Sequence, residues 1–392
     1  MKIVEVLGAS LKLGVTSFGG PVAHLGYFHD EYVGRRAWLS EEAFADLVAL
    51  CQLLPGPASS QVNMSIGLLR AGVGGAVAAW IGFTLPSAVA LTAFALLAGA
   101  PGVLGSGWLH GLLLSAVAIV AHAVWTMARR LAPDAPRASL AAVAAIISLL
   151  FPSGLAQVAV IAGGGLAGWA LLRTGGGAAR EPLSFGTSRA AAVACLCLFA
   201  LLLGGLPVLR LVFPVHWLAV AESFYRAGSL VFGGGHVVLP LLHREVVPPG
   251  WISDAGFMAG YAAAQAVPGP LFTFSAYLGA SMSTGGAAIA LAALALVSIF
   301  LPSFLLLLGI LPFWGTLRAR TGFQSALAGV NAAVVGLLAA ALYSPVWTSA
   351  VVSVPDFCIV LAGFILLARW RSPPWLVVAL GAAAGEIVRL LG

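Results

Sequence analysis

The sequence predicts an all-α polytopic membrane protein whose two homologous halves form an inverted repeat. Composition and an internal repeat carry this prediction. The chain has 392 residues, of which 61% are hydrophobic and only 8% charged, and its mean hydropathy is +1.04. A soluble domain of this composition would lack the polar groups that its surface needs. Apolar stretches of about 20 residues, the length of a membrane-crossing helix, recur along the chain.

The internal repeat matches residues of the first half to residues about 214 positions later. The stretch KLGVTSFGG at 12–20 returns as RAGSLVFGG at 226–234. Further matches are His29 with His243, Glu31 with Glu245, Phe44 with Phe257, Gln52 with Gln265, LPGP (54–57) with VPGP (267–270), and LPS (85–87) with LPS (301–303). Chance does not align so many special residues, so we infer a duplication.

We expect about 13 membrane segments, six in each half and one in a linker. The expected segments are 3–28, 41–70, 74–100, 107–131, 138–152 and 155–173 in the first half, 190–209 in the linker, and six more between 216 and 391. The predicted domains are a first repeat (1–180), a linker with an extra helix (181–213) and a second, inverted repeat (214–392). Because Glu5 and Lys12 interrupt the first apolar segment, we expect it to be retained rather than cleaved as a signal peptide.

Basic residues in the loops predict the orientation. If every segment crosses, most loop arginines of both halves fall on one side, which the positive-inside rule makes cytoplasmic. The N-terminus is then cytoplasmic and the C-terminus lies on the opposite side, with Arg35, Arg36 and Arg210 as exceptions. The alternative is that the broken segments are re-entrant hairpins, because each half of 41–70 is only about 20 Å of helix. In that case we expect Arg318 and Arg320 to fall outside.

Each Pro-Gly-Pro break starts a half-helix. Gly56 can adopt positive φ, and Pro57 suits the first helical turn because it has no N–H to lose. The N–H groups that follow lack helical partners, and such helix starts attract anions. The residues concerned are Gly56, Ala58 and Ser59 in the first copy, and Gly269, Leu271 and Phe272 in the second.

The Phe-Gly-Gly breaks place glycines at matched positions, namely Gly19, Gly20, Gly233 and Gly234. They allow a nest of N–H groups or a close approach of the backbone to a ligand. The alternative is that they only let helices pack closely.

Lys12 and Arg226 each lie about ten residues into an apolar segment, or about 15 Å along a helix. A cation near the bilayer centre costs about 2.5–3.5 kcal/mol on insertion scales. Snorkelling to the interface is the alternative, and it works only near helix ends. The functional interpretation is that the two cations balance a dianion in one cavity.

Other polar residues allow two interpretations each. Gln52 and Gln265 donate to an anion or cap a freed carbonyl, and Glu31 and Glu245 act as gates or salt-bridge partners. His24 and His236 are proton-sensitive groups or packing residues. We expect no metal site, because the four cysteines (Cys51, Cys195, Cys197 and Cys358) lie in apolar segments. An enzyme is disfavoured, because the sequence has no nucleophile–base, metal-binding or cofactor motif.

Four motifs, FGGPVAHL (18–25), PGP (55–57), FGGGHVVLPLL (232–242) and AQAVPGPLF (264–272), resemble the chromate ion transporter family over essentially the whole chain. The family's basic-glycine-FGG pattern falls on Lys12, Gly14, Phe18, Gly19 and Gly20, and on Arg226, Gly228, Phe232, Gly233 and Gly234. The resemblance implies export of chromate from the bacterial cytoplasm, linked to the proton-motive force and sensitive to sulfate.

We therefore expect a secondary active transporter, an antiporter of the bacterial inner membrane that exports chromate by alternating access and confers chromate resistance. A permease for sulfate or another tetrahedral oxyanion is the alternative, and a passive anion channel is a third class. The expected partners are chromate or sulfate and membrane lipid, with no cofactor and no nucleic acid, and a homodimer is compatible with this. The expected substrate-binding residues are Lys12, Gly19, Gly20, Gln52, Gly56, Ala58, Ser59, Arg226, Gly233, Gly234, Gln265, Gly269, Leu271 and Phe272; the gating or coupling residues are Glu31, Glu245, His24 and His236.

Overall fold

The computed structural model describes residues 2–18, 20–98, 107–151, 153–172, 188–232, 237–314 and 320–391, and these ranges are helical with no strand. The helices of the first half are α1 (Lys2–Thr16), α2 (Gly20–Phe28), the π-helix η1 (His29–Arg35), α3 (Glu41–Leu53), α4 (Ala58–Ala98), α5 (Gly107–Leu131), α6 (Ala135–Leu150) and α7 (Gly154–Leu171). The others are α8 (Arg189–Val212), α9 (His216–Leu230), α10 (Val238–Val246), α11 (Asp254–Ala266), η3 (Leu271–Thr273), α12 (Phe274–Ser281), α13 (Gly285–Ile310), η4 (Leu311–Phe313), α15 (Thr321–Ala341), η5 (Leu342–Trp347), α16 (Thr348–Ala350), α17 (Val354–Ala368) and α18 (Pro374–Leu391).

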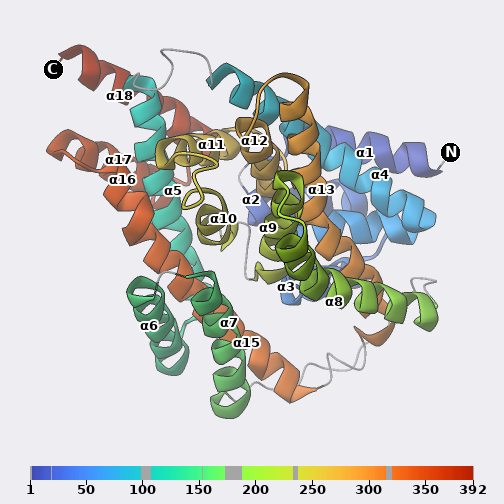
Figure 1. Ribbon diagram of the computed structural model, residues 1–392. Coiled ribbons are helices and arrows are strands. Elements are labelled where there is room, and N and C mark those ends of the chain that lie inside the picture. The colour runs from blue at the N-terminus through green and yellow to red at the C-terminus, as the bar shows by residue number, and fades with distance from the viewer. Residues whose placement is uncertain are drawn as a thin grey trace.

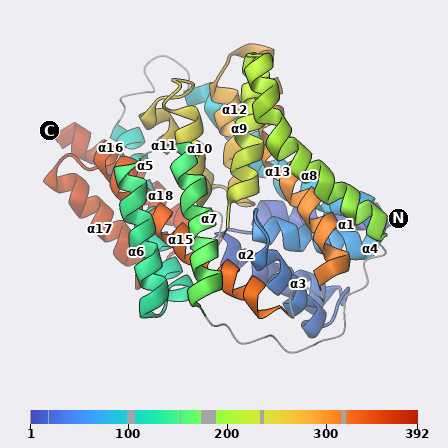
Figure 2. The same ribbon diagram turned by 60° about the horizontal axis from the view of Figure 1, so that its bottom comes forward.

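Two groups of helices flank a centre of shorter ones (Figures 1 and 2). Helices α5, α6, α17 and α18 lie on the side of the C-terminus, and α1, α4, α8 and α13 lie on the side of the N-terminus. The short helices α2, α3 and α9–α12 lie between them. Within the described ranges, five helical stretches are long and apolar enough to cross a membrane, namely Ala58–Leu97, Gly107–Leu131, Arg189–Val212, Gly285–Phe313 and Thr321–Trp347. The chain is therefore a multi-pass membrane protein.

Helix α4 consists of two antiparallel arms. The backbone breaks at Ala71 (φ −146°) and at Gly72 (φ +63°), so the chain reverses there. The backbone of Gly67 packs against Gly75, and Asn63 Nδ2 donates to Ala79 O at 3.0 Å across the two arms. Only the second arm, residues 73–98, is long enough to cross the membrane, at about 1.5 Å per residue.

The broken segments of the first half fold back on themselves. In the first, Glu5 near the start of α1 lies 3.8 Å from Arg36 after η1, although the Phe-Gly-Gly break separates them. In the second, the guanidinium of Arg70, at the end of the first α4 arm, lies 5.2 Å from the ring of Trp38, just before α3. The two ends of each segment therefore lie together, and each break is the tip of a hairpin.

The second half contains the same two hairpins. The ring of His216, at the start of α9, lies 5.1 Å from that of Trp251, which follows α10. The hydroxyl of Tyr277 in α12 donates to Gly256 O at the start of α11 at 2.8 Å. The prediction that each of these segments runs straight across the membrane was wrong. The hairpin alternative, raised for the two Pro-Gly-Pro segments, describes them, and the two Phe-Gly-Gly segments fold back in the same way. Apolar length did not reveal this, because two half-length arms have the same total length as one crossing helix.

The hairpin tips lie beside the midpoints of the crossing helices. Gly14, three residues before the first tip, packs its backbone against Gly82 and Phe83, about 15 Å along the second α4 arm. Gly228 packs in the same way against Ile299 of α13. No side chain fits at either glycine, which is why the arms approach so closely.

The two crossing helices next to the tips, α13 and the second α4 arm, run antiparallel. Trp80, early in the α4 arm, lies 5.8 Å from Phe304, late in α13. Phe94, late in the α4 arm, stacks 5.7 Å from Tyr277, which precedes α13. The hairpins of the two halves consequently open toward opposite ends of the molecule.

Candidate functional site

The four hairpin tips meet in pairs, and each pair joins the two halves. Gly56 N donates to Val231 O at 2.7 Å, and Gly269 N donates to Ser17 O at 2.9 Å. Since Gly56 matches Gly269 and Ser17 matches Val231 in the repeat, the two hydrogen bonds are equivalent. Each Pro-Gly-Pro turn is thus held against the residue that precedes the Phe-Gly-Gly motif of the other half.

Both Pro-Gly-Pro glycines need to be glycine. Gly56 has φ +120° and Gly269 has φ +102°, a region that L-residues rarely adopt. A Cβ on Gly269 would lie 2.8 Å from Ser87 Oγ, and one on Gly56 would collide with Ser303 Oγ. These two serines end the repeated LPS motifs, so each turn also packs against the crossing helix of the other half.

The helix starts after the two turns expose backbone donors. The first helical hydrogen bond of α4 runs from Gln61 N to Pro57 O at 2.9 Å, so the N–H groups of Ala58 and Ser59 have no acceptor within the helix. After Gly269 the chain forms the short η3 turn instead, in which Thr273 N donates to Pro270 O at 3.0 Å. The predicted half-helix start is therefore regular in the first copy and tighter in the second.

Several buried polar atoms near these turns have no partner among the described residues. They are Ser17 Oγ, Ser60 Oγ, Gln61 Oε1 and Ser303 Oγ. Each residue is at most 1% exposed. A buried polar group without a hydrogen bond is costly, so such atoms commonly mark a site for water or a ligand.

Both predicted cations form ion pairs with the predicted carboxylates. Lys12 Nζ lies 2.5 Å from Glu31 Oε2, and Arg226 NH2 lies 2.5 Å from Glu245 Oε2. The two pairs occupy matched positions of the repeat, 19 residues apart in each case. Glu31 and Glu245 are thus salt-bridge partners of the cations in this conformation.

The surroundings of the two ion pairs differ. Glu31 also binds Arg36 at 2.7 Å and lies 3.5 Å from Arg35. Arg226 instead lies 3.1 Å from a second carboxylate, that of Glu222, which also binds Arg210 at 2.7 Å. The first pair therefore has surplus positive charge, and the second is balanced.

The matched histidines His29 and His243 form equivalent ion pairs in the two halves. His29 binds Glu41 at 2.8 Å, and His243 binds Asp254 at 2.6 Å at the matched position. Hydrogen bonds to Glu41 and Asp30 raise the pKa of the His29 imidazole and favour its charged form. These residues lie at the open end of the hairpins and not at the tips.

His24 bridges the two tips of the first half. Its Nδ1 lies 3.2 Å from Ser59 Oγ, and its ring also hydrogen-bonds to the backbone of Ser17. The matched residues of the second half are Val238 and Phe272, which cannot form this link. His24 is 1% exposed, so it is part of the buried site.

The two predicted glutamines have different surroundings. The Gln52 amide oxygen accepts from Arg130 of α5 at 2.9 Å. The side chain of Gln265 hydrogen-bonds to Tyr261, and its Nε2 is buried without a partner among the described residues. Gly20 begins α2, whereas Gly19, Gly233, Gly234 and His236 lie outside the described residues.

Sequence reasoning missed Ser17, Ser60, Gln61, Ser87 and Ser303. The repeated LPS motif was a signal for Ser87 and Ser303, since a serine after proline recurs at both positions. The polar run Ser59–Gln61 directly after Pro57 was a second signal. Of these groups, the unpartnered hydroxyls of Ser60 and Ser303 lie on the side of the α4 helix start, and they supply donors that suit an anion rather than a cation.

Sequence comparison relates this chain to chromate transport proteins. The sequence model of the chromate transporter family matches residues 4–169 and 218–386. The chain is 28% identical to a chromate transport protein of Pseudomonas aeruginosa over 99% of its own length and 93% of the relative's. It is 27% identical to a chromate transport protein of Cupriavidus metallidurans, over 95% of this chain and 90% of the relative. A probable chromate transport protein of Synechococcus elongatus is 25% identical over 96% of this chain and 93% of its own.

No solved structure matches this chain. Members of the matched family are transport proteins and not enzymes. Because the family model covers both halves, the chain belongs to the chromate transporter family.

Proposed function

We propose that this protein is a secondary active transporter that exports chromate, a tetrahedral dianion, across the bacterial inner membrane. The observation that carries the proposal is the pair of reciprocal hydrogen bonds from Gly56 to Val231 and from Gly269 to Ser17. They gather the non-helical backbone of all four hairpins at half the depth of the crossing helices. Irregular backbone at such depth is tolerated only inside protein or beside a cavity, and it marks the binding site in many transporters.

The two halves act as an inverted repeat in this proposal, with boundaries near 1–180 and 214–392. The antiparallel course of α13 and the second α4 arm supports it, and so do the two separate family matches. Helix α8 links the halves and faces lipid, since Ala192 is its one buried residue in the described chain. Alternating access then consists of one half rocking against the other about the shared tips.

Lys12 and Arg226 exchange partners during transport in this mechanism. Arg226 and Glu245 line a narrow recess beside α7, so this pair borders space at the protein surface. Glu31 keeps Arg36 when Lys12 moves away, and Arg226 keeps Glu222 when it releases Glu245. Lys12 can therefore follow a passing dianion without leaving Glu31 unpaired, whereas the release of Arg226 leaves Glu245, whose side chain is 15% exposed, without an ion pair among the described residues.

The four hairpins change the number of Lys and Arg residues on each side of the membrane, and this number predicts the orientation. With four hairpins, the described residues Lys2, Arg35, Arg36, Arg70, Arg129, Arg130, Arg137, Arg189, Arg320, Arg369 and Arg371 fall on the side of the N-terminus. Arg210, Arg244 and Arg389 fall on the other side. We infer a cytoplasmic N-terminus and a periplasmic C-terminus. The surplus positive charge around Glu31 then faces the cytoplasm and attracts the anion there, which favours export.

Cysteine labelling tests this topology. In a variant whose four native cysteines are replaced, we expect Ala37→Cys and Val73→Cys to react with an impermeant maleimide only after lysis of spheroplasts. Pro249→Cys and Thr284→Cys should react in intact spheroplasts. If 41–70 crossed the membrane, Ala37→Cys and Val73→Cys would react from opposite sides.

Everted membrane vesicles test the function, because export appears there as uptake. We expect saturable chromate uptake above its equilibrium level, inhibition by sulfate, and loss of accumulation when the proton gradient is collapsed. Uptake that never exceeds equilibrium would identify a channel. Tighter binding of sulfate than of chromate would favour a sulfate permease instead.

A further inference from the structure

The two Pro-Gly-Pro turns match in backbone but differ in the side chains around them. The first continues as Ala58-Ser59-Ser60-Gln61, and the matched residues of the second are Leu271-Phe272-Thr273-Phe274. A duplication that kept the fold has thus left polar groups at one turn and apolar groups at the other. The turn at Gly56 is called the first turn, and the turn at Gly269 the second turn.

A buried hydroxyl without a partner adjoins the first turn. The position of a Cβ on Gly56 lies in contact with Ser303 Oγ and 2.7 Å from Gln61 Nε2. Ser303 is fully buried, and its hydroxyl has no partner among the described residues. Gln61 Nε2 donates to Pro55 O at 2.7 Å, which braces the turn. The hydroxyl of Ser303 therefore lies unused beside the N-terminus of α4.

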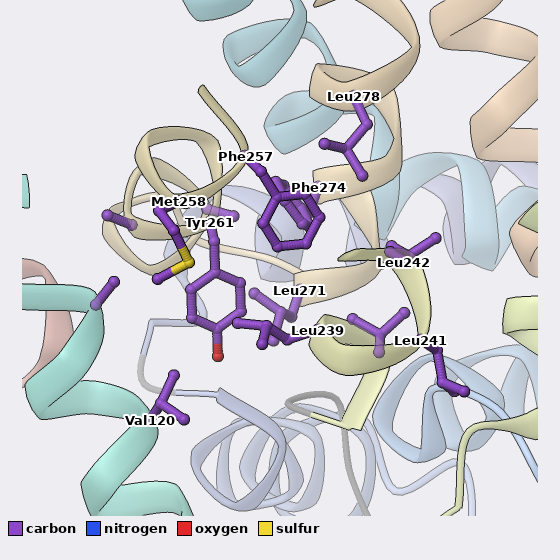
Figure 3. Close-up of a cluster of buried hydrophobic side chains, with 14 of the residues drawn as sticks. Val120, Leu239, Leu241, Leu242, Phe257, Met258, Tyr261, Leu271, Phe274 and Leu278 are labelled. Carbon is purple, nitrogen blue, oxygen red and sulfur yellow. The ribbon is translucent and has the colours of Figure 1, made fainter. Parts of the chain in front are cut away.

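At the second turn the hydroxyls of Ser87, Thr273 and Ser275 are occupied, whereas those of Ser17 and Thr84 have no partner among the described residues. Ser87 Oγ, the counterpart of Ser303, donates to Thr84 O at 3.1 Å. Thr273 Oγ1 donates to Pro270 O at 2.7 Å, and Ser275 Oγ donates to Phe272 O at 2.8 Å. Around this turn, Leu271 and Phe274 pack among apolar side chains of α10 and α11, including Leu239, Phe257 and Tyr261 (Figure 3).

We propose that the transported oxyanion binds at the first turn alone, held by the N–H groups of Ala58 and Ser59 and by the hydroxyl of Ser303, while the second turn is an apolar seal. This inference rests on the proposed transport function and assigns its binding groups. A tetrahedral dianion has acceptors only, so it needs unused donors and a favourable dipole, and both occur at the start of α4. The hydroxyl of Ser303 can rotate to donate, whereas that of Ser87 would first have to give up a hydrogen bond.

Matched serine substitutions test the inference through the KM for chromate in everted vesicles. We expect Ser303→Ala to raise KM about tenfold or more, because a hydrogen bond to a charged group is lost. Ser303→Cys should also raise KM, since a thiol is a weak donor. Ser87→Ala should leave KM within about twofold, and so should Ser17→Ala, whose hydroxyl belongs to the chain that meets the second turn.

The outcomes separate this inference from the proposed function. Wild-type vesicles without saturable chromate uptake would refute the function itself. If wild-type vesicles take up chromate, two results would refute binding at the first turn without refuting the transport function. One is an equal change in KM for Ser303→Ala and Ser87→Ala, and the other is an unchanged KM for Ser303→Ala. A KM rise for Ser17→Ala as large as that for Ser303→Ala would also overturn it. If Ser303→Ala is not recovered from membranes, Ser303→Cys, which fills the same space, decides.

Discussion

Replacing Arg226 with alanine should lower the thermal stability of the protein more than replacing Lys12 with alanine. Arg226 lies between Glu222 and Glu245, whose side chains are 3% and 15% exposed. Its removal leaves Glu245 without an ion pair among the described residues. Breaking a fully buried pair by removing one partner costs about 3–5 kcal/mol, and we expect a cost at the lower end of that range because Arg226 is itself 33% exposed.

The Lys12 pair is different, because the lysine side chain is 45% exposed and Glu31 keeps Arg36. Exposed pairs contribute about 0–1 kcal/mol. We therefore expect Arg226→Ala to lower the Tm of the purified protein in detergent by about 5 °C or more, and Lys12→Ala by less than about 3 °C. Both variants should lose chromate transport, since each removes a cation that we propose to lie on the substrate path.

Two further variants control for the charge. Arg226→Ala combined with Glu245→Gln should recover part of the lost Tm, because it removes the bare carboxylate. Arg226→Lys should lie between wild type and alanine, since an ammonium cannot replace the planar fork of a guanidinium. An equal fall in Tm for Lys12→Ala and Arg226→Ala would contradict the different surroundings described for the two pairs. Wild-type flux in either single variant would remove that cation from the transport mechanism.

Gly56→Ala and Gly269→Ala should each abolish transport. Alanine at their positive φ values is strained by about 1–3 kcal/mol. Its Cβ would also press on Ser303 or Ser87 and push apart the joined tips. Because each glycine N–H bonds to the other half, the damage reaches both repeats.

Gly8→Ala is the matched control for the glycine variants. A Cβ on Gly8, in α1, meets nothing within 4 Å. Alanine is favoured over glycine in a helix by about 0.5–1 kcal/mol, so this variant should keep wild-type transport and Tm. Chromate flux and Tm of the three variants, measured side by side, check the prediction. Normal flux in Gly56→Ala would show that the tip geometry is not needed.

The repeat made much of the site predictable. Matching Lys12 to Arg226 and Glu31 to Glu245 identified the four residues that form two equivalent ion pairs in the structure, although the pairing itself was not predicted. Matching the two Pro-Gly-Pro segments identified the turns that join the halves. Charged residues and breaks in helical backbone are costly inside a membrane. When they recur at matched positions of a repeat, they therefore indicate functional residues.

The course of the chain between those positions was not predictable. Residues 41–70 have the apolar length of one crossing helix, and nothing in their composition shows that Arg70 returns to Trp38. The loop arginines also misled, because counting each broken segment as a crossing placed Arg35 and Arg36 on the wrong side. Hairpins remove that conflict for both residues, and Arg320 stays on the N-terminal side.

The sequence could not predict which serine hydroxyls lack a hydrogen-bond partner, for a different reason. Serine in an apolar helix usually donates to a carbonyl of the preceding turn, as Ser65 does to Gln61 O at 2.7 Å. Only three-dimensional contacts reveal that Ser303 makes no such bond while Ser87 does. The difference between the two turns is thus a property of packing between the halves.

Locating bound chromate tests the central claim most directly, namely that the four hairpin tips form the oxyanion site. Crystals of the protein grown with chromate should show an anomalous difference peak at the chromium absorption edge beside Gly56 and Ser303, at the start of α4. Excess sulfate should remove this peak. A single peak on the outer surface beside Lys12 or Arg226, with nothing at the tips, would contradict the account.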